Sequence, residues 1–275
     1  MQMDLGYILL NTIVYGTVAM VIAWFFWFGK ILNFSLGAYM MMGGYILYRF
    51  ITYGFSLLNI IILTIFIGSF LLINRGLLKY FPNDKKRDHV WLVITLGASI
   101  VLENLTSYVY WPNSVSLSIM HMPVYGLVII FLILIWFFFY LYKYSFLGIT
   151  LNAISEDSKL VRGLGVNTSK ILQITFFCLL ILLLACSFLL LNESNLRAGD
   201  GIFYMIKWIW IMILVWIAKK EYMFFGALLY VLIEYLLFIQ RWLPISYKET
   251  LILIIILFVL LFKPEWLFSL RKRKI

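Results

Sequence analysis

Nine long apolar runs divide the chain, and they constrain its fold more than any other feature. The runs lie at residues 5–28, 36–53, 55–74, 90–111, 123–142, 171–191, 202–218, 223–240 and 250–262. Each is long enough to cross, or nearly cross, a hydrocarbon core about 30 Å thick. In lipid, a helix satisfies its own backbone hydrogen bonds. The sequence therefore predicts an all-α, polytopic transmembrane helical bundle of eight or nine membrane segments, with residues 1–275 forming a single transmembrane domain.

The number of segments stays open because of the second run, 36–53, which holds Gly37, Gly43 and Gly44. Since glycine weakens a helix, this run is either a continuous span or a broken or re-entrant one. The side on which the N-terminus lies depends on that choice. The first residues, MQMDLGYILLN, lack a basic region and a small-residue cleavage site. We therefore expect a retained first span and not a signal peptide.

The composition excludes an ordinary soluble domain, because 64% of the residues are hydrophobic and only 12% are charged. The net charge of +10 does not indicate nucleic-acid binding, because the basic residues are distributed among loops and not along one soluble face. Cys178 and Cys186 lie inside one apolar run, a position that suits small core residues better than a disulfide or a metal site.

The basic residues predict the sidedness of the loops. Five fall on one side of the predicted membrane: Arg49, Arg197, Lys207, Arg241 and Lys248. The other seventeen fall on the opposite side: Lys30, Arg75, Lys79, Lys85, Lys86, Arg87, Lys143, Lys159, Arg162, Lys170, Lys219, Lys220, Lys263, Arg271, Lys272, Arg273 and Lys274. By the positive-inside rule the second side is cytoplasmic, so Lys159 is expected inside and Asn113 and Asn195 outside.

A polar stretch at residues 144–170 interrupts the apolar pattern more than any other. Its apolar residues Leu151, Ile154, Val161 and Leu164 recur at helical spacing opposite a charged side. This spacing predicts a short amphipathic helix along the membrane surface. Asn167 and Thr168 are expected to cap the following span. On composition alone, the stretch is equally well interpreted as a solvated connector.

The sequence offers no enzyme site. It contains no G-x-x-x-x-G-K-[ST] loop that would cradle nucleotide phosphates. The two histidines, His89 and His121, stand in no catalytic or metal-ligand pattern. We therefore expect no catalytic residue, no metal and no cofactor in this chain.

In the polar stretch, Gly148, Ala153, Glu156 and Asp157 are followed by the run Gly165-Val166-Asn167. In this order and spacing they resemble the cytoplasmic coupling segment of permease subunits in ABC importers, closest to the branched-chain amino acid (LivH-type) family. Asn152 replaces the arginine that the family usually carries, and Val161 replaces an alanine. The resemblance implies that the stretch docks onto an ATPase subunit and passes movement to the membrane helices.

Two further motifs of the same family are found in the apolar runs. Asn33-Phe34-Ser35-Leu36-Gly37 resembles N-F-A-H-G, with leucine where the family usually has histidine. The small residues that follow, with Gly43 and Gly44, either allow close helix packing or line a translocation path.

The second motif runs from Ile94 to Leu105 and resembles the family's T-L-G-x-[SA]-x-x-L-x-N, so we place Thr95, Gly97, Glu103 and Asn104 as path candidates. An ionisable residue within a span needs a partner or a wet cavity. Glu103 is therefore either at the path or near interfacial water. Glu234 is a second acid within an apolar span, and one of the two could be a hydrogen-bond anchor between helices.

Two departures from the family pattern concern its glycines. Lys219-Lys220-Glu221-Tyr222 stands where the family has a glycine-rich turn, and Trp266 and Ser269 replace two glycines of the C-terminal motif. The resemblance nevertheless covers nearly the whole chain in the same order.

The resemblance implies a permease subunit of a bacterial ABC importer in the inner membrane. Its expected partners are a second, LivM-like permease, ABC ATPase subunits and an extracytoplasmic solute-binding protein. The expected solute is a branched-chain or other hydrophobic amino acid. Two alternatives stay open: a related permease for urea, amides, nucleosides or sugars, and a membrane scaffold or membrane-embedded enzyme without transport.

Overall fold

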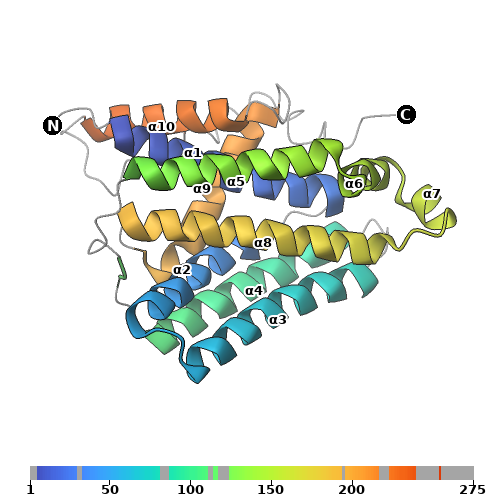
Figure 1. Cartoon of the computed structure of the whole chain (residues 1–275), viewed down its shortest axis with the longest axis horizontal. Helices are drawn as coiled ribbons and strands as arrows, with labels where there is room; N and C mark the ends of the chain where they lie inside the picture. The colour runs from blue at the N-terminus through green and yellow to red at the C-terminus, as the bar shows by residue number, and fades with distance from the viewer. Residues whose placement is uncertain are drawn as a thin grey trace. The chain divides into compact units, whose positions relative to one another are not determined.

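The computed structural model describes residues 5–29, 33–80, 87–110, 114–116, 124–193, 196–216, 223–239 and 254. These residues form α-helices and one short 3-10 helix, η1, with no strand longer than an isolated bridge (Figure 1). The elements are α1 (Leu5–Gly29), α2 (Ser35–Tyr53), α3 (Leu57–Tyr80), α4 (Arg87–Tyr110), α5 (Val124–Tyr144), α6 (Phe146–Glu156), α7 (Ser158–Gly163), α8 (Thr168–Glu193), η1 (Ala198–Asp200), α9 (Gly201–Trp216) and α10 (Met223–Ile239).

Eight of the nine predicted apolar runs coincide with these helices to within a few residues. Four described helices are long and apolar enough to cross a membrane: α1, α3, α4 and α8. A fifth candidate is the pair α5 and α6, bent by 67° at its junction. The structure thus confirms an all-helical membrane fold, whereas the count of eight or nine spans stays a prediction. The ninth run, 250–262, lies outside the described residues apart from Ile254.

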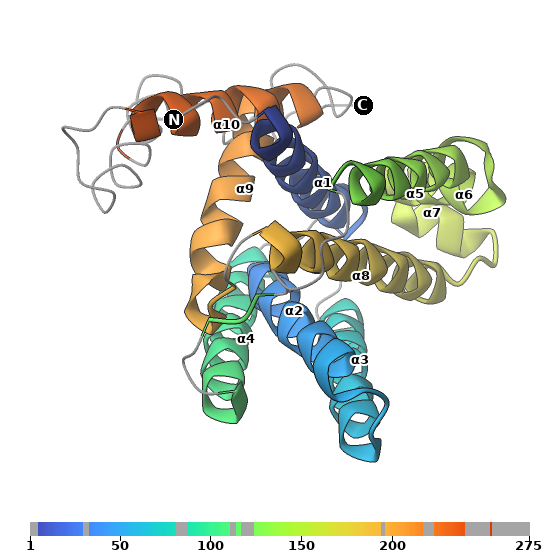
Figure 2. The same cartoon turned by 60° about the vertical axis from the view of Figure 1, so that its left-hand side comes forward.

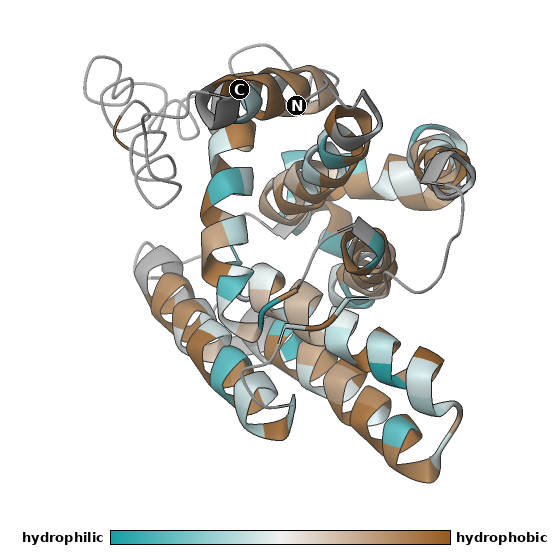
Figure 3. Cartoon of the chain, turned by 90° about the vertical axis from the view of Figure 1, so that its left-hand side faces the viewer, coloured by the Kyte–Doolittle hydropathy of each residue, from teal (hydrophilic) through white to brown (hydrophobic). Residues whose placement is uncertain are grey.

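Apolar side chains cover the outer surfaces as well as the core. Figure 3 shows apolar residues around most of the helices, with polar positions scattered among them. On α3 and α4, large side chains such as Ile65, Leu72, Val93 and Val101 are exposed. An apolar exterior of this extent suits contact with lipid and not with water.

The chain divides into two compact units, residues 1–20 with 207–275 and residues 21–206. In the larger unit α2 is the central helix and packs against α3, α4, α8 and η1 (Figure 2). Every residue from Ser35 to Ile46 is buried. The run 36–53 lies in one uninterrupted helix, so the alternative of a broken helix is wrong, whereas a re-entrant course stays a prediction.

Small residues let the neighbours of α2 approach closely. A Cβ at Gly43 would lie 2.4 Å from Leu184 of α8, and one at Gly44 would lie 2.5 Å from Leu196. Hydrogen bonds also link the helices: Ser187 Oγ donates to the carbonyl of Met40 at 2.6 Å, and Tyr45 donates to that of Leu196 at 3.2 Å. Gly43 and Gly44 therefore pack against helices of this unit.

The smaller unit contains the first part of α1, most of α9 and α10. Gly226 of α10 lies against Val215 of α9, where a Cβ would overlap the valine side chain. The rings of Tyr15 and Tyr230 meet edge to face with centroids 6.0 Å apart. Lys207 Nζ of α9 lies 2.9 Å from Glu234 Oε1 of α10. Glu234 thus links α9 and α10, a role that the sequence left open between Glu103 and Glu234.

Two loops that the sequence places outside the cell lie side by side. Val115 and Leu196 exchange both backbone hydrogen bonds, at 3.0 and 2.9 Å. Both loops lie at the C-terminal end of α8, whereas the stretch 144–170 leads into its N-terminal end (Figure 1). At 1.5 Å per residue, the 26 residues of α8 separate these ends by about 39 Å.

The close approach at Gly37 gives a first prediction. A Cβ there would overlap the backbone carbonyl of Gly201, which cannot move without shifting α9. We expect Gly37→Ala to lower the free energy of unfolding by about 1–3 kcal/mol, the usual cost of overpacking. Gly97→Ala is the matched control, because a Cβ at Gly97 meets nothing within 4 Å. Thermal unfolding of both purified variants in detergent is the measurement, and equal melting temperatures would contradict close packing at Gly37.

Candidate functional site

The candidate coupling segment begins with the bend between α5 and α6. Ser145 lies between these helices in extended conformation, and its Oγ accepts a hydrogen bond from the amide of Gly148 at 3.2 Å. This is the N-cap arrangement, which satisfies an amide that a helix leaves unpaired at its start. A Cβ at Gly148 would overlap the carbonyl oxygen of Tyr142. The sharp bend between α5 and α6 therefore requires a residue without a Cβ at position 148, which is glycine.

Two hydrogen bonds hold α6 against neighbouring helices, and a third within α6 orients the hydroxyl of Ser155. The hydroxyl of Tyr142 donates to Asn152 Oδ1, which links α6 back to α5. Trp27 Nε1 of α1 donates to Ser155 Oγ at 3.0 Å, and Ser155 Oγ donates to the carbonyl of Asn152 at 2.7 Å. Leu151 and Ile154 are buried, as their spacing predicted. Asn152, which replaces the family's arginine, thus has a structural role in this chain.

The stretch forms two helices and not one, because the chain leaves helical geometry at Asp157. This residue is extended, with φ −143° and ψ 97°, and ends α6 through a bond from its amide to the carbonyl of Ala153. Its carboxylate then accepts from the amides of Lys159 at 2.8 Å and Leu160 at 3.1 Å, which starts α7. The prediction of a single amphipathic helix is therefore wrong, since a capping aspartate competes with continuation of the helix.

Gly165 closes α7. Its φ of +82° lies in the left-handed region, its amide bonds to the carbonyl of Arg162 at 2.9 Å, and the amide of Val166 bonds to that of Val161 at 3.4 Å. This pair of bonds is the Schellman motif, which favours glycine at this position. Asn167 Oδ1 then accepts from the amide of Lys170 at 3.1 Å, so the predicted cap of the next span is confirmed.

The outer surface of α6 and α7 mixes charge with exposed apolar side chains. Glu156, Asp157, Lys159 and Arg162 are exposed, and Val161 is buried. Leu160 and Leu164 are 61% and 74% exposed. The expectation that Leu164 belongs to the buried face is wrong, because α7 ends before it and the turn carries its side chain outward.

The two acids of the segment differ in their environment. The Asp157 carboxylate is occupied by the amides of α7. For Glu156, the last residue of α6, no side-chain hydrogen bond or ion pair is found among the described residues. Only Glu156 therefore presents an uncommitted carboxylate, a distinction that the adjacent sequence positions do not reveal.

The path candidates of α2 lie in the core of the larger unit. Asn33 Oδ1 accepts from the amide of Ser35 at 3.0 Å and from its hydroxyl at 2.6 Å, which begins α2. Asn33 Nδ2 lies 3.5 Å from Asn74 Oδ1 of α3. Gly37 faces Gly201 at the start of α9. These contacts explain the motif through packing and capping, and a place on a path for solute stays a prediction.

The four candidates of α4 do not share one face. Thr95 is fully buried, whereas Gly97 and Asn104 are exposed. Glu103 Oε1 accepts a hydrogen bond from the amide of Ile202 at 2.8 Å, at the N-terminus of α9, where a carboxylate is favourably placed. This link spans 99 residues of sequence, and it gives Glu103 the partner that a carboxylate within an apolar helix needs.

Gly201 is a residue that sequence reasoning missed. A Cβ there would lie 2.7 Å from Glu103 Oε1 and 2.9 Å from the amide nitrogen of Ala38. The start of α9 thus meets both α2 and α4 at one glycine. Gly201 follows Gly199 and Asp200, a turn-like composition that signals a helix start but not the identity of its neighbours.

These features define a multi-pass helical membrane protein with a structured pair of short helices at one end of its long helices. Residues 5–260 match the family described as branched-chain amino acid transport system / permease component, and the chain belongs to that family. Neither the curated proteins nor the solved structures gave a match. The family is one of ABC-type permeases, which are transport components that work with ATPase and other subunits.

The positive φ of Gly165 gives a second prediction. Gly165→Ala should cost about 1–2 kcal/mol, because a Cβ is strained in the left-handed conformation. Gly163→Ala is the matched control, since Gly163 is equally exposed and lies within α7. Hydrogen exchange of the α7 amides is the measurement. We expect exchange about five-fold or more faster in Gly165→Ala alone, and equal protection in both variants would contradict a structural need for this glycine.

Proposed function

We propose that the chain is a permease subunit of a bacterial ABC importer in the cytoplasmic membrane, and that α6 and α7 couple it to an ATPase subunit. The observation that carries the proposal is the capped pair of short helices, which exposes Glu156 and Leu160 while the opposite side is anchored to α1 and α5. Charged and apolar side chains exposed together suit a docking surface better than a plain connector.

The anchoring suggests how movement would pass from this surface to the membrane helices. A force on α7 reaches α6 through Asp157, and reaches α8 through Arg162, whose Nε donates to Thr168 Oγ1 at 3.0 Å. From α6 it reaches α5 and α1 through Asn152 and Ser155. Closure of the ATPase subunits would in this way shift an equilibrium between outward-open and inward-open states.

The proposed assembly contains a second, LivM-like permease, two ATPase subunits and an extracytoplasmic solute-binding protein. Family membership supports ATPase and further subunits in general terms. We propose a branched-chain or other hydrophobic amino acid as the solute, on the family's description. A related permease for urea, amides, nucleosides or sugars is the alternative. Binding assays that present these solutes to the partner solute-binding protein would decide which class is transported.

The different environments of the two acids give a test of coupling. In the reconstituted complex, Glu156→Gln should strongly reduce substrate-stimulated ATP hydrolysis, because an interface charge is lost. Asp157→Ala should reduce it through loss of the α7 cap, which costs about 1 kcal/mol. Asp157→Asn should leave stimulation near normal, because asparagine caps a helix about as well as aspartate.

Expression and basal ATP hydrolysis are the controls for these three variants. Normal stimulation in both Glu156→Gln and Asp157→Ala would mean that the segment is a connector. Equal loss in Asp157→Asn and Asp157→Ala would mean that the charge of Asp157, and not its cap, is what the partner needs.

Sidedness gives a further prediction. In a background with Cys178→Ser and Cys186→Ser, Lys159→Cys should react with an impermeant maleimide only after the membrane is opened. Ser114→Cys, in the loop paired with Leu196, should react in intact cells. The positions of these loops near opposite ends of α8 support this expectation. Reaction of Lys159→Cys from outside would overturn both the sidedness and the coupling role.

A further inference from the structure

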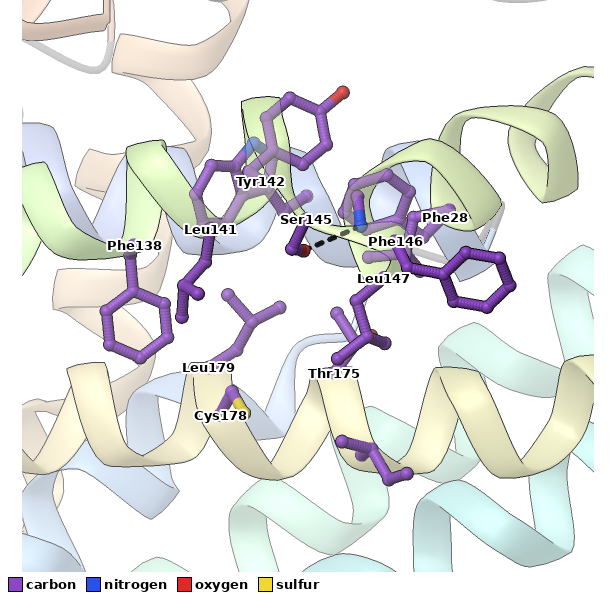
Figure 4. A pocket seen from close by; sticks show the side chains of 14 residues that line it. Phe28, Phe138, Leu141, Tyr142, Ser145, Phe146, Leu147, Thr175, Cys178 and Leu179 are labelled. Carbon is purple, nitrogen blue, oxygen red and sulfur yellow. Dashed lines mark hydrogen bonds between the residues drawn. The ribbon is translucent and has the colours of Figure 1, made fainter.

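An apolar groove of about 340 Å³ lies in the larger unit where α5 bends into α6. It is enclosed by α1, α5, α6 and α8. Its floor is buried, with Trp24, Phe28, Leu151 and Leu179 at 1–5% exposure. Its rim is open, with Phe146 at 78% exposure and Leu147 and Ile174 at about 40%. Figure 4 shows side chains of the bend facing Thr175, Cys178 and Leu179 of α8 across the groove.

The lining excludes a polar ligand. The three hydroxyls of the lining residues are already bonded. Tyr142 donates to Asn152 Oδ1, Ser145 Oγ accepts from the amide of Gly148, and Thr175 Oγ1 donates to the carbonyl of Ile171 at 2.9 Å. The remaining wall is aromatic and aliphatic apart from the thiol of Cys178. Water or a polar solute would find few partners in such a site, whereas a hydrocarbon chain buries apolar surface on both sides.

One basic residue stands near the open rim of the groove. Lys170 precedes Ile174 by one helical turn on α8, so the two side chains share a face. Lys170 is exposed, and Ile174 belongs to the lining of the groove. An apolar groove with a lysine beside its rim matches an anionic amphiphile.

We propose that this groove binds one acyl chain of an anionic phospholipid, with the phosphate near Lys170. Because Gly148 and Leu151 belong to the wall, a bound chain supports the bend that orients α6. The lipid site is inferred from the lining of the groove and the lysine beside it. The effect of a bound lipid on coupling rests on the function proposed above.

The test is photo-crosslinking of the full-length protein in phosphatidylcholine vesicles that contain phosphatidylglycerol with a diazirine in one acyl chain. Cross-links should concentrate on peptides covering 138–151 and 171–179. A phosphatidylcholine probe with the same diazirine should label these peptides at least about three-fold less.

Two pairs of variants sharpen the test. Cys178→Trp fills the groove and should reduce the labelling at least about five-fold, whereas Phe177→Trp, on the adjacent outward position of α8, should leave it unchanged. Lys170→Gln should reduce the preference for phosphatidylglycerol without abolishing labelling. Lys159→Gln, a lysine of α7, should not change the preference.

Three outcomes would overturn the proposal. Cross-links spread evenly over exposed faces such as those of α3 and α4 would indicate bulk lipid. Labelling that persists in Cys178→Trp would place the lipid elsewhere. Labelling absent from 171–179 in the intact assembly would mean that another segment or a partner subunit fills the groove. The cross-linking readout needs neither ATP nor solute. A negative cross-linking result would therefore overturn the lipid site without changing the interpretation of ATP hydrolysis in Glu156→Gln.

Discussion

Close backbone contact around α2 is the constraint on which the larger unit depends. Lipid gives no hydrophobic driving force between helices, so association relies on tight packing and hydrogen bonds. The small residues of α2 allow that packing: Gly37 meets Gly201, and Gly44 meets Leu196. Glu103 belongs to the same crossing, where its Oε1 accepts a hydrogen bond from the amide of Ile202. One buried helix thus fixes where α4, α8 and the start of α9 lie.

In the proposed coupling segment, local capping sets where each short helix begins and ends. Ser145, Asp157, Gly165 and Asn167 mark in turn the start of α6, the joint between the helices, the end of α7 and the start of α8. Each of these capping hydrogen bonds joins groups that are two to five residues apart in the sequence. A segment built from local caps keeps its shape while the long helices move, which suits a part that transmits displacement.

The helices could be predicted from the sequence because apolar length and glycine or polar punctuation are local signals. The same reasoning predicted the cap at Asn167, and it indicated that one of the acids Glu103 and Glu234 could join two helices. It failed at Asp157 and Leu164, where apolar periodicity continued through a residue whose side chain ends one helix and starts another. It also missed the contacts of Glu103 with Ile202 and of Trp27 with Ser155, which join residues 99 and 128 positions apart. Such pairs arise from packing, and a single sequence carries no signal for them.

The bend at Gly148 combines close backbone contact with local helix capping. On its concave side the carbonyl of Tyr142 leaves no space for a Cβ, so the angle between α5 and α6 is set by backbone contact. The groove between α6 and α8 lies beside that bend, and its lining is apolar. A helix held at one end by backbone contact and along one side by the proposed acyl chain would respond to what fills the groove. The membrane would then be a structural element of the proposed coupling segment, in addition to being its surroundings.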